Sequence, residues 1–595
     1  MPIIGKKIDT TSANFGNMLE NNCLIVDKTR MIKEFIEGKE VSLIVRPRRF
    51  GKTSNMFMLY YFFSAEVFGL PTKGLFDAFV IAQEENGAFL KQHQGQYPVI
   101  FITFKDTKEP SFESTVSQVR DLVQELYREH KQFMHSEHID DDNRALFQQY
   151  IDGTVNEEQL QKSLKFLSAF LFKAHGGKRV IILIDEYDTP LTNAYQYHFL
   201  EPLSNFMRDM YSAALKDNPY LEKGLMTGIL RISKSNMLSG LNNLEVYTLL
   251  DKQYSQYFGF TEDEIKELVH HTQNDANLND IRSYYNGYNI GGTVIYNPWS
   301  TMKFLDRKEL VPYWVLTSND SLLKNVFLKS NDEIKTQLMA LMQGESIIGD
   351  IDINLRYEDL MEKPSALWTL LLFCGYVTVE SKTSEGILWS CQLKIPNREV
   401  LAQYTGIFKE WFKETLGHRY TSLLTSLTTG DVELFTKSLG NYLMHSLSIR
   451  DVHGTLSESF YHGFVAGLIG SIRDTHWVSS NGESGRGFYD VMLIPKNVTQ
   501  SLAILIEFKQ TKKMDALQLN AEKALTQINT THYDAVLTGE RYSHIQRVVM
   551  IGLAFCEKAV IAAHQIKNLK TDQPSTVALT KTYHHPAYEK ESDDD

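Results

Sequence analysis

Short apolar runs bounded by turn residues recur along the N-terminal part of the chain. The run VSLIV spans residues 41–45, and five consecutive apolar residues at 180–184 precede Asp185. An apolar run without alternation is typical of a strand covered on both faces, as in a parallel α/β sheet. The segments 97–104 and 224–230 have the same character. The pattern therefore predicts one parallel sheet built from these four strands.

Other apolar segments have the length and spacing of helices. Residues 54–68 are apolar over several turns and contain no helix breaker, which predicts a buried helix. The run LWTLLLFCGYV at 367–377 also suits a buried helix, and Thr261 with Glu264 forms a capping-box pattern. The Ser/Thr-rich segment 421–431 predicts a turn region and a joint.

Two strand-like segments stand close together in the C-terminal third. Residues 485–495 and 502–513 are separated by the polar segment KNVTQS, which predicts a β-hairpin. A hairpin centred on that turn places Asp490 opposite Glu507 or one residue off. Cross-strand neighbours lie roughly 5 Å apart at Cβ, so these two carboxylates can share one cation. Lys509 follows two residues after Glu507 and therefore lies on the same face of the strand.

Composition narrows the class of protein. The 595 residues are 43% hydrophobic and 23% charged, which is typical of a globular protein of two to four domains. No apolar run reaches the roughly 18 residues of a membrane-spanning helix, so we expect no membrane partner. The segment MPIIGKKIDTTSANFG has no apolar stretch as long as a secretory signal needs.

Charge and cysteine usage narrow the location and the partners. The four widely spaced cysteines argue against a zinc ribbon or a disulfide scaffold. They fit a cytoplasmic protein, or a nuclear one in a eukaryotic host. A net charge of −12 gives no overall attraction to nucleic acid, so such binding needs a local basic surface.

The segment RPRRFGKT, residues 46–53, ends like a phosphate-binding loop between a predicted strand and a predicted helix. Backbone N–H groups around Gly51 would cradle phosphates, Lys52 would reach the β and γ oxygens, and Thr53 would hold Mg²⁺. Arg46 stands where such a loop has its first glycine, so the first turn needs another shape. Taken alone, a chance GKT in a basic turn is the alternative. The predicted nucleotide-binding set is completed by Arg48, Arg49 and Phe50.

A second motif supports the nucleotide hypothesis. Asp185 and Glu186 follow a buried strand, where ligands bind in open α/β sheets. Asp185 would bind the Mg²⁺ that Thr53 also holds, and Glu186 would orient or deprotonate the attacking water. A plain acidic end to the strand is the alternative. Thr227 or Arg231 could sense the γ-phosphate; equally, Thr227 is structural and Arg231 a salt-bridged surface residue.

The C-terminal carboxylates suggest a second chemistry. Asp490 and Glu507 would hold Mg²⁺, which activates water, and Lys509 would orient that water or offset developing charge. Glu458, on a predicted helix, could add a ligand or orient a metal-bound water. Gln527, at the end of another predicted helix, could contact substrate or support Lys509. An isolated E-x-K pattern is equally typical of a solvated strand face, and Glu458 of a helix surface.

Several motifs occur in the order of a known family. RPRRFGKT, VIILIDEYDTPL, TGILRISKSNMLSGLNNL and YFGFTEDEI make residues 25–400 resemble the AAA-ATPase-like family of P-loop proteins. That family carries the R-P-R-R-F-G-K-[ST] form, so the resemblance makes Arg46 a family feature. ESFYHGF, FYDVMLIP, IEFK and ALTQI make residues 457–553 resemble the PD-(D/E)XK nuclease domain that typically follows. The family often accompanies mobile elements, and the resemblance implies a nucleotide site more firmly than turnover.

We therefore expect an α/β chain with a P-loop NTPase core and a C-terminal α/β nuclease-like domain. The expected parts are an AAA-ATPase-like core (1–255), a helical lid or coupling region (256–400), a helical connector (401–455), a PD-(D/E)XK nuclease-like domain (456–570) and a polar mobile tail (571–595).

The predicted function is ATP binding and hydrolysis fused to Mg²⁺-dependent cleavage of nucleic acid, DNA rather than RNA, in mobile-element or defence biology. One alternative is a non-cleaving nucleotide-dependent switch that binds nucleic acid or protein. Another is a secreted effector or toxin with the same chemistry. A homo-oligomer stays open, because no arginine finger can be assigned.

Overall fold

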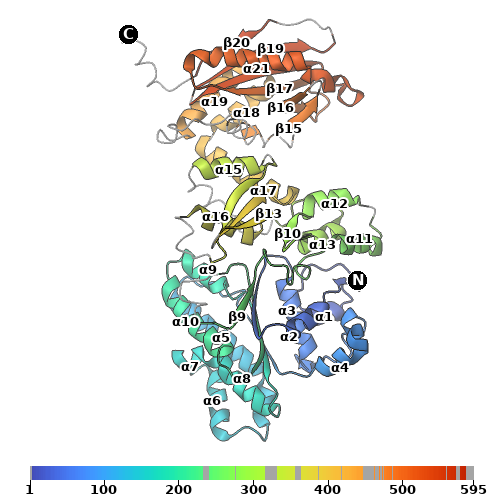
Figure 1. The fold of residues 1–595 in the computed structure, drawn as a ribbon, viewed down its shortest axis with the longest axis vertical. Helices are drawn as coiled ribbons and strands as arrows, with labels where there is room; N and C mark the ends of the chain where they lie inside the picture. The colour runs from blue at the N-terminus through green and yellow to red at the C-terminus, as the bar shows by residue number, and fades with distance from the viewer. Residues whose placement is uncertain are drawn as a thin grey trace. The chain divides into compact units, whose positions relative to one another are not determined.

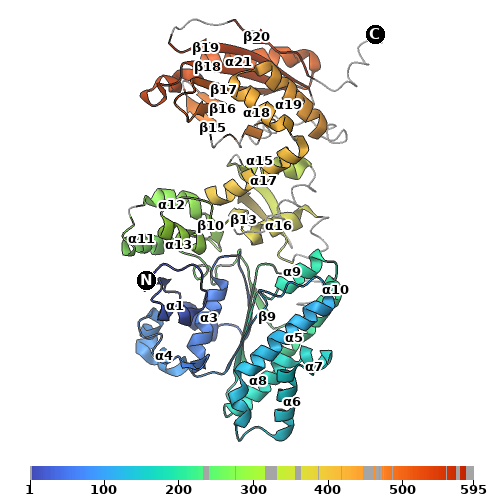
Figure 2. The same ribbon diagram turned by 180° about the vertical axis from the view of Figure 1, so that it is seen from behind.

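The structure is a computed structural model in which the chain folds into two compact units (Figures 1 and 2). One unit comprises residues 1–318 and 348–400, and the other comprises residues 319–347 and 401–595. The domain boundaries expected from the sequence stay a prediction. The structure describes residues 3–231, 240–274, 276–314, 332–342, 344–354, 363–385, 388–416, 418–446, 461, 465, 468–469, 472, 475–484, 487–557, 559–570 and 576–583.

A five-stranded parallel sheet forms the centre of the first unit, which confirms the sheet predicted from the apolar runs. Every residue of the two strands that carry the predicted motifs, β3 and β7, is buried, because both faces of the sheet are covered. The strand order is β6 (Val99–Thr103), β7 (Val180–Asp185), β8 (Leu221–Gly228), β3 (Val41–Val45) and β9 (Leu244–Tyr247).

Helices cover both faces of this sheet (Figures 1 and 2). On one face lie α2 (Arg30–Glu37) and α3 (Lys52–Phe63); on the other lie α5 (Phe112–Glu129), α8 (Ser163–Ala174) and α10 (Leu200–Leu215). The helix predicted over 54–68 ends early, at Phe63, and short strands follow it. The smaller elements are α1 (Phe15–Glu20), α4 (Ala88–His93), α6 (Asp141–Asp152), α7 (Glu157–Gln161), α9 (Thr189–Gln196), β1 (Ile3–Ile4), β2 (Ile25–Val26), β4 (Glu66–Val67) and β5 (Leu70–Pro71).

The region expected to be helical, 256–400, also contains strands. Residues Ile347–Ile351 alternate between buried and exposed, which is the period of a half-buried strand rather than a helix. The predicted capping box of Thr261 and Glu264 is confirmed. The helices are α11 (Glu262–His271), α12 (Leu278–Tyr285), α13 (Pro298–Arg307) and α16 (Pro364–Cys374); the strands are β10 (Tyr288–Ile290), β11 (Thr293–Ile295), β12 (Ile347–Ile351), β13 (Thr378–Glu385) and β14 (Leu388–Lys394).

A six-stranded mixed sheet dominates the second unit, and the predicted hairpin forms its β16–β17 pair. Helix α21 (Leu517–Thr531) packs on one face, while α18 (His418–Thr429) and α19 (Val432–Ser446) lie on the other (Figures 1 and 2). Only β17 and β18 pair in parallel among the described strands of this sheet. The strands, in order, are β15 (His476–Ser484), β16 (Gly487–Pro495), β17 (Leu502–Gln510), β18 (Arg547–Cys556), β19 (Ala559–Asn568) and β20 (Ala578–Leu579); α15 (Asp332–Met342) belongs to the same unit.

One prediction in the second unit was wrong. The segment 421–431, predicted as a turn, is largely helix α18, because Leu423 and Leu427 are buried on one face. Its hydroxyls bond back to carbonyls one turn earlier, as in Thr428 Oγ1 to Leu424 O at 3.0 Å, which lets the helix tolerate them. Within the segment 571–595, which stays a prediction as a mobile tail, Ala578–Leu579 form β20 and pair with β19. Among the described residues, no helix combines the length and apolar character that crossing a membrane requires.

Helix α17 (Arg398–Leu416) begins in the first unit and continues into the second. Its first turn carries Glu399, whose side chain is fully buried. The carboxylate accepts hydrogen bonds from Ser300 Oγ at 2.8 Å and from the Trp314 backbone N–H at 2.7 Å. Burial raises the pKa of Glu399 to about 7, despite these hydrogen bonds. The start of α17 is therefore anchored by a carboxyl group that titrates near neutral pH.

This anchor makes stability depend on pH. Because the pKa of Glu399 is higher in the folded than in the unfolded chain, its contribution is fully present below about pH 4.5 and is lost as pH rises through about 7. We expect Glu399→Gln, which cannot ionise, to gain stability relative to wild type over this interval, by up to a few kcal/mol. Urea unfolding of both proteins at several pH values measures the difference. A pH-independent difference would contradict the assignment.

Candidate functional site

The predicted phosphate-binding loop connects the end of β3 to the start of α3. Gly51 is the N-cap of α3 and has a left-handed backbone with φ of 80°. A Cβ atom there would meet nothing within 4 Å, so the backbone conformation rather than space favours glycine. The first N–H groups of α3 lack partners within the helix and face the loop, which suits an anion.

Lys52 lies buried across the loop. Its Nζ is 3.3 Å from Arg46 O, 3.2 Å from Pro47 O and 3.3 Å from Glu186 Oε1. The ammonium group is thus held by two carbonyls and one carboxylate, between the loop and the end of β7. A phosphate group placed at the loop can replace these neutral acceptors with a charged one.

Asp185, the last residue of β7, accepts hydrogen bonds from three threonine hydroxyls. Thr53 Oγ1 donates to its Oδ2 at 2.8 Å, Thr103 Oγ1 donates to the same oxygen at 3.3 Å, and Thr227 Oγ1 donates to Oδ1 at 2.6 Å. Burial and the charge of Glu186 raise the pKa of Asp185, and the threonine hydrogen bonds oppose this rise. The structure therefore brings the predicted Mg²⁺ ligands Thr53 and Asp185 into direct contact.

Sequence reasoning missed Thr103, although it lies one residue before the end of the predicted strand 97–104 and is the last residue of β6. In the structure it is paired with Asp185 in the register of β6 and β7. The available signal was its place: the last residues of neighbouring parallel strands meet at one edge of the sheet. Thr227, proposed as a sensor or a structural residue, is fully buried against Asp185.

Glu186 lies one residue past β7, with a left-handed backbone at φ of 55°. Burial alone would raise its pKa, but the charges of Lys52 and Arg48 and hydrogen bonds from Lys52 and Thr189 outweigh burial, and the pKa is lowered. Thr189 Oγ1 donates to Glu186 Oε2 at 3.2 Å. Glu186 is thus an ionised carboxylate beside the lysine of the loop.

Asp188, which sequence reasoning missed, braces the end of the neighbouring strand. Its Oδ2 accepts the backbone N–H groups of Ile229 at 2.9 Å and Leu230 at 2.8 Å. Burial, together with the charge of Glu186, raises the pKa of Asp188 to about 6. Arg231 follows directly and is partly buried, and no described carboxylate lies within ion-pair distance of it. The two interpretations of Arg231, as a γ-phosphate sensor and as a salt-bridged surface residue, stay predictions.

The side chain of Arg46 is fully buried and does not face the loop's phosphate side. Its Nη1 donates to Val45 O at 2.7 Å, Thr248 O at 2.9 Å and Tyr247 O at 3.2 Å, and its guanidinium lies 5.4 Å from the Phe258 ring. Burial lowers the pKa of Arg46 to about 9. Arg46 therefore links β3 to the end of β9. This contact fixes the first turn of the phosphate-binding loop, at a position where such loops have glycine.

The other predicted loop residues divide into exposed and buried ones. Arg48 and Arg49 are exposed, and the Arg49 guanidinium lies 4.7 Å from the ring of Trp299. Phe50 is fully buried and meets the Tyr288 ring edge-on, with centroids 4.8 Å apart. Phe50 thus packs the loop against the region that follows the sheet, while the two arginines stay open to a ligand.

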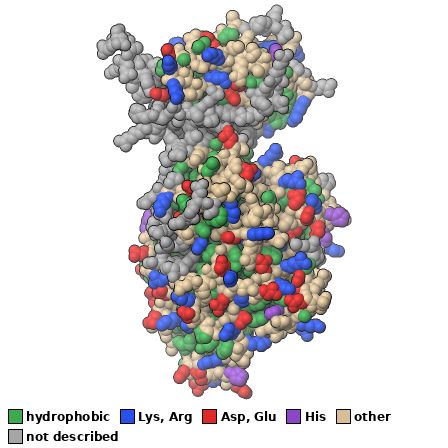
Figure 3. Space-filling view, viewed as in Figure 1, with side chains coloured by type: hydrophobic (Ala, Val, Ile, Leu, Met, Phe, Trp, Pro, Cys, Tyr) green, Lys and Arg blue, Asp and Glu red, His purple; other side chains and the backbone are tan. Residues whose placement is uncertain are grey.

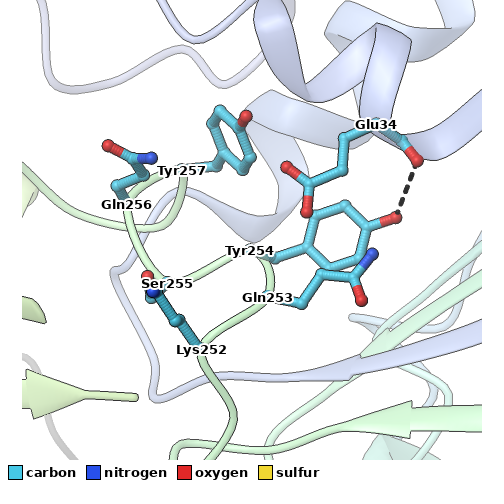
Figure 4. Close-up of a pocket in the computed structure, with 7 residues that line it drawn as sticks. All are labelled: Glu34, Lys252, Gln253, Tyr254, Ser255, Gln256 and Tyr257. Carbon is cyan, nitrogen blue, oxygen red and sulfur yellow. Dashed lines mark hydrogen bonds between the residues drawn. The ribbon is translucent and has the colours of Figure 1, made fainter. Parts of the chain in front are cut away.

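An open pocket of about 420 Å³ lies between α2 and the loop 252–257 (Figure 4). It is lined by Glu34 and that loop, and Tyr254 Oη donates to Glu34 O at 3.4 Å. Asn55 of α3 holds the same loop through Tyr257 O at 3.0 Å. None of the predicted nucleotide-binding residues lines this pocket, so it is distinct from the phosphate cradle.

The second candidate centre lies where the pairing of β16 and β17 ends. The register pairs Val491 with Ile506, and the next residues along the two strands are Asp490 and Glu507. Asp490 Oδ2 accepts the backbone N–H of Phe508 at 2.7 Å, in place of a strand carbonyl. The hairpin therefore places two carboxylates directly opposite each other.

Glu507 is buried, with 2% of its surface exposed, and carries the least satisfied charge of this centre. Its Oε1 lies 3.4 Å from Lys509 Nζ, whereas Oε2 has no hydrogen-bond partner among the described residues. Burial and the charge of Asp490 raise the pKa of Glu507 to about 7, against the attraction of Lys509. A buried carboxylate oxygen without a partner is costly unless a cation binds it, and paired carboxylates suit Mg²⁺.

The remaining predicted residues of this centre are placed differently. Gln527 lies on α21, partly buried, and its Nε2 donates to Tyr533 Oη at 3.2 Å. Glu458 lies outside the described residues. Among the described residues, no group of three or more His, Cys, Asp or Glu side chains forms a metal site. The described centre therefore offers two carboxylates.

Comparison with known proteins matches the two candidate sites to two families. Residues 10–238 match the family described as predicted AAA-ATPase, and residues 456–565 match the PD-(D/E)XK nuclease superfamily. A protein of Azotobacter chroococcum mcd 1, described as an uncharacterized protein in the vnfD 5′ region, is 25% identical over 476 residues. That alignment covers 78% of this chain and 83% of the other.

A solved structure also aligns with the chain: a signal transduction ATPase with numerous domains (STAND) from Pyrococcus horikoshii, which carries a tetratricopeptide repeat sensor. The identity is 13% and the TM-score 0.24. The alignment covers 76% of this chain and 54% of that protein, so this chain spans about half of its length.

The role of Arg46 leads to a stability prediction. Arg46→Met keeps much of the side-chain volume but leaves the carbonyls at the end of β9 unpaired in a buried position. We expect the free energy of unfolding to fall by roughly 2–4 kcal/mol. Arg48→Met, the matched change at an exposed neighbour, should shift it by less than about 0.5 kcal/mol. Equal stability of the two variants in urea unfolding would contradict the assignment.

Proposed function

We propose that this chain, in which an AAA-ATPase-like N-terminal region is fused to a C-terminal PD-(D/E)XK nuclease superfamily domain, hydrolyses ATP in the first part and cuts nucleic acid in the second. The observation that carries the cutting activity is the buried Glu507 opposite Asp490, with one carboxylate oxygen that has no partner among the described residues. DNA is the proposed substrate, in mobile-element or defence biology. A non-cleaving nucleotide-dependent switch is the outcome if no cutting is found.

In the nucleotide site, the N-terminus of α3 and Lys52 would bind the phosphates, because both offer donors at the loop. Thr53 and Asp185 would hold Mg²⁺, since their oxygens already lie 2.8 Å apart. Bound Mg²⁺ would supply charge stabilisation to the transferred phosphoryl group. Glu186, with its lowered pKa, would accept a hydrogen bond from the attacking water and orient it.

In the nuclease domain, Asp490 and Glu507 would hold the divalent ion, and Lys509 would lie beside it. The ion would supply a water of lowered pKa and offset charge on the phosphate. Lys509 Nζ, 3.4 Å from Glu507 Oε1, would donate a hydrogen bond to that water or to a phosphate oxygen. The Asp490 carboxylate is fixed by the backbone N–H of Phe508, so its orientation does not depend on the ion.

The nucleotide state would reach the second unit through α17. Phe50 of the loop packs on Tyr288, and the pKa of Tyr288 is raised well above its ordinary value by burial and by the charge of Glu399. Glu399 in turn anchors the first turn of α17, which continues into the unit that carries the nuclease centre. A shift of the loop on binding ATP can therefore move the start of this helix.

Two variants separate nucleotide binding from hydrolysis. We expect Lys52→Ala to abolish ATP binding, because it removes the buried cation of the loop. We expect Glu186→Gln to keep binding but to lower the hydrolysis rate by at least about 100-fold, since the water loses its acceptor. Binding of a fluorescent ATP analogue and phosphate release measure the two effects. Unchanged hydrolysis in both variants would contradict the proposed site.

The nuclease centre is tested by its buried carboxylate. We expect Glu507→Gln to lower Mg²⁺-dependent cleavage of DNA by at least about 100-fold. Glu522→Gln on the exposed side of α21 is the matched control and should cut as wild type does. Circular dichroism and melting temperature check that both variants fold. Cleavage at the wild-type rate by the Glu507→Gln variant would contradict the assignment of the nuclease centre to Glu507.

A further inference from the structure

Three side chains form a small surface on the nuclease domain, which we call the aromatic platform: Trp477 of β15, with Arg541 and Tyr542 of the short helix Glu540–Tyr542. The Arg541 guanidinium lies 5.8 Å from the Trp477 ring and 5.5 Å from the Tyr542 ring. The two rings are 6.1 Å apart and inclined by 67°. The Trp477 side chain is 39% exposed, so part of its ring is open to a ligand.

The charge of Arg541 is available to a ligand. Arg541 is exposed, and no described carboxylate forms an ion pair with it. Basic and acidic side chains are interspersed on the face of the molecule seen in Figure 3, and the net charge of the chain is −12. An exposed guanidinium that lies close to two aromatic rings is complementary to a phosphate that carries a base beside it.

The platform lies on the same face of the sheet as the metal centre. Trp477 pairs with Ile494 across β15 and β16, and directly opposite residues share one face. Ile494 lies four residues after Asp490 on the same strand, so alternation puts both on that face. The separation along the strand is about 13 Å at roughly 3.3 Å per residue. That equals about four nucleotide steps of 3.4 Å each. The distance is measured through the core of the domain, because Met492 and Ile494 are buried against α21 on that face.

We propose that the aromatic platform binds an unpaired nucleotide of the substrate strand, a few steps from the phosphate that is cut. The base stacks on the open face of Trp477, and Arg541 pairs with the adjoining phosphate. Bases inside a duplex are already stacked on each other, so this surface selects a single-stranded tail or gap over a blunt duplex. The proposal rests on the proposed nuclease function, because Glu507 defines where the scissile phosphate lies.

Binding to a cleavage-deficient chain tests the platform. The full chain with Glu507→Gln is titrated into a labelled duplex with a single-stranded tail and into the blunt duplex. Trp477→Ala should weaken binding of the tailed DNA by about tenfold, the loss of one base stack, and leave the blunt duplex unchanged. Trp477→Phe keeps a stacking ring and should recover most of the affinity. An RNA tail on the same duplex shows which sugar the surface accepts.

Charge is tested by a matched pair. Arg541→Gln should weaken binding of the tailed DNA more than that of the blunt duplex, because its charge is coupled to the stacked base. Arg547→Gln removes the same charge from an exposed residue of β18 whose guanidinium lies over no described ring. Arg547→Gln should weaken binding of both DNAs equally, because it removes only a non-specific electrostatic attraction to the phosphates.

Three outcomes decide between the proposals. Weaker binding of tailed DNA by Trp477→Ala, with recovery by Trp477→Phe, supports the platform. Unchanged binding by Trp477→Ala and Arg541→Gln, while the chain with an intact Glu507 still cuts, overturns the platform and leaves the nuclease standing. A wild-type chain that neither cuts nor binds any of these nucleic acids overturns both.

Discussion

Burying a charged group without a partner is costly, and both candidate centres are organised by how that cost is met. Arg46 is fully buried because carbonyls at the end of β9 surround its guanidinium. Lys52 is held between loop carbonyls and Glu186, and Asp185 between three threonine hydroxyls. Glu507 differs, because one of its oxygens lacks a partner among the described residues. The charges of Lys52 and Asp185 are met by contacts within the fold, whereas in the proposed function the open oxygen of Glu507 would bind an ion.

The two centres are built differently on their strands. Asp185 is the last residue of β7 and accepts hydrogen bonds from hydroxyls of the adjoining elements. Glu507 lies within the buried run of β17, which stays paired with β18, at the point where the pairing with β16 ends. There Asp490 on β16 accepts the backbone N–H of Phe508. Helix α17 begins in the first unit and continues into the second.

The parts predictable from the sequence are those set by local patterns. Unbroken apolar runs identified β3 and β7, and the short polar turn identified the hairpin that opposes Asp490 and Glu507. Long-range contacts were not predictable. The carbonyls that bind Arg46 lie about 200 residues away along the chain. Helix α18 was not predicted, because its Ser/Thr-rich composition is typical of a turn. In the structure its threonine hydroxyls donate hydrogen bonds to carbonyls of the same helix, which composition alone does not show.

The nucleotide site and the nuclease centre are proposed to act as one enzyme. The most direct measurement is the rate at which the full chain cuts supercoiled plasmid in Mg²⁺, with ATP, with a nonhydrolysable analogue and without nucleotide. We expect nucleotide to change the rate of wild type but not of Lys52→Ala, and no cutting by Glu507→Gln in any condition. Metal-dependent cutting at one rate in all three conditions, in wild type and Lys52→Ala alike, would contradict coupling between the two centres.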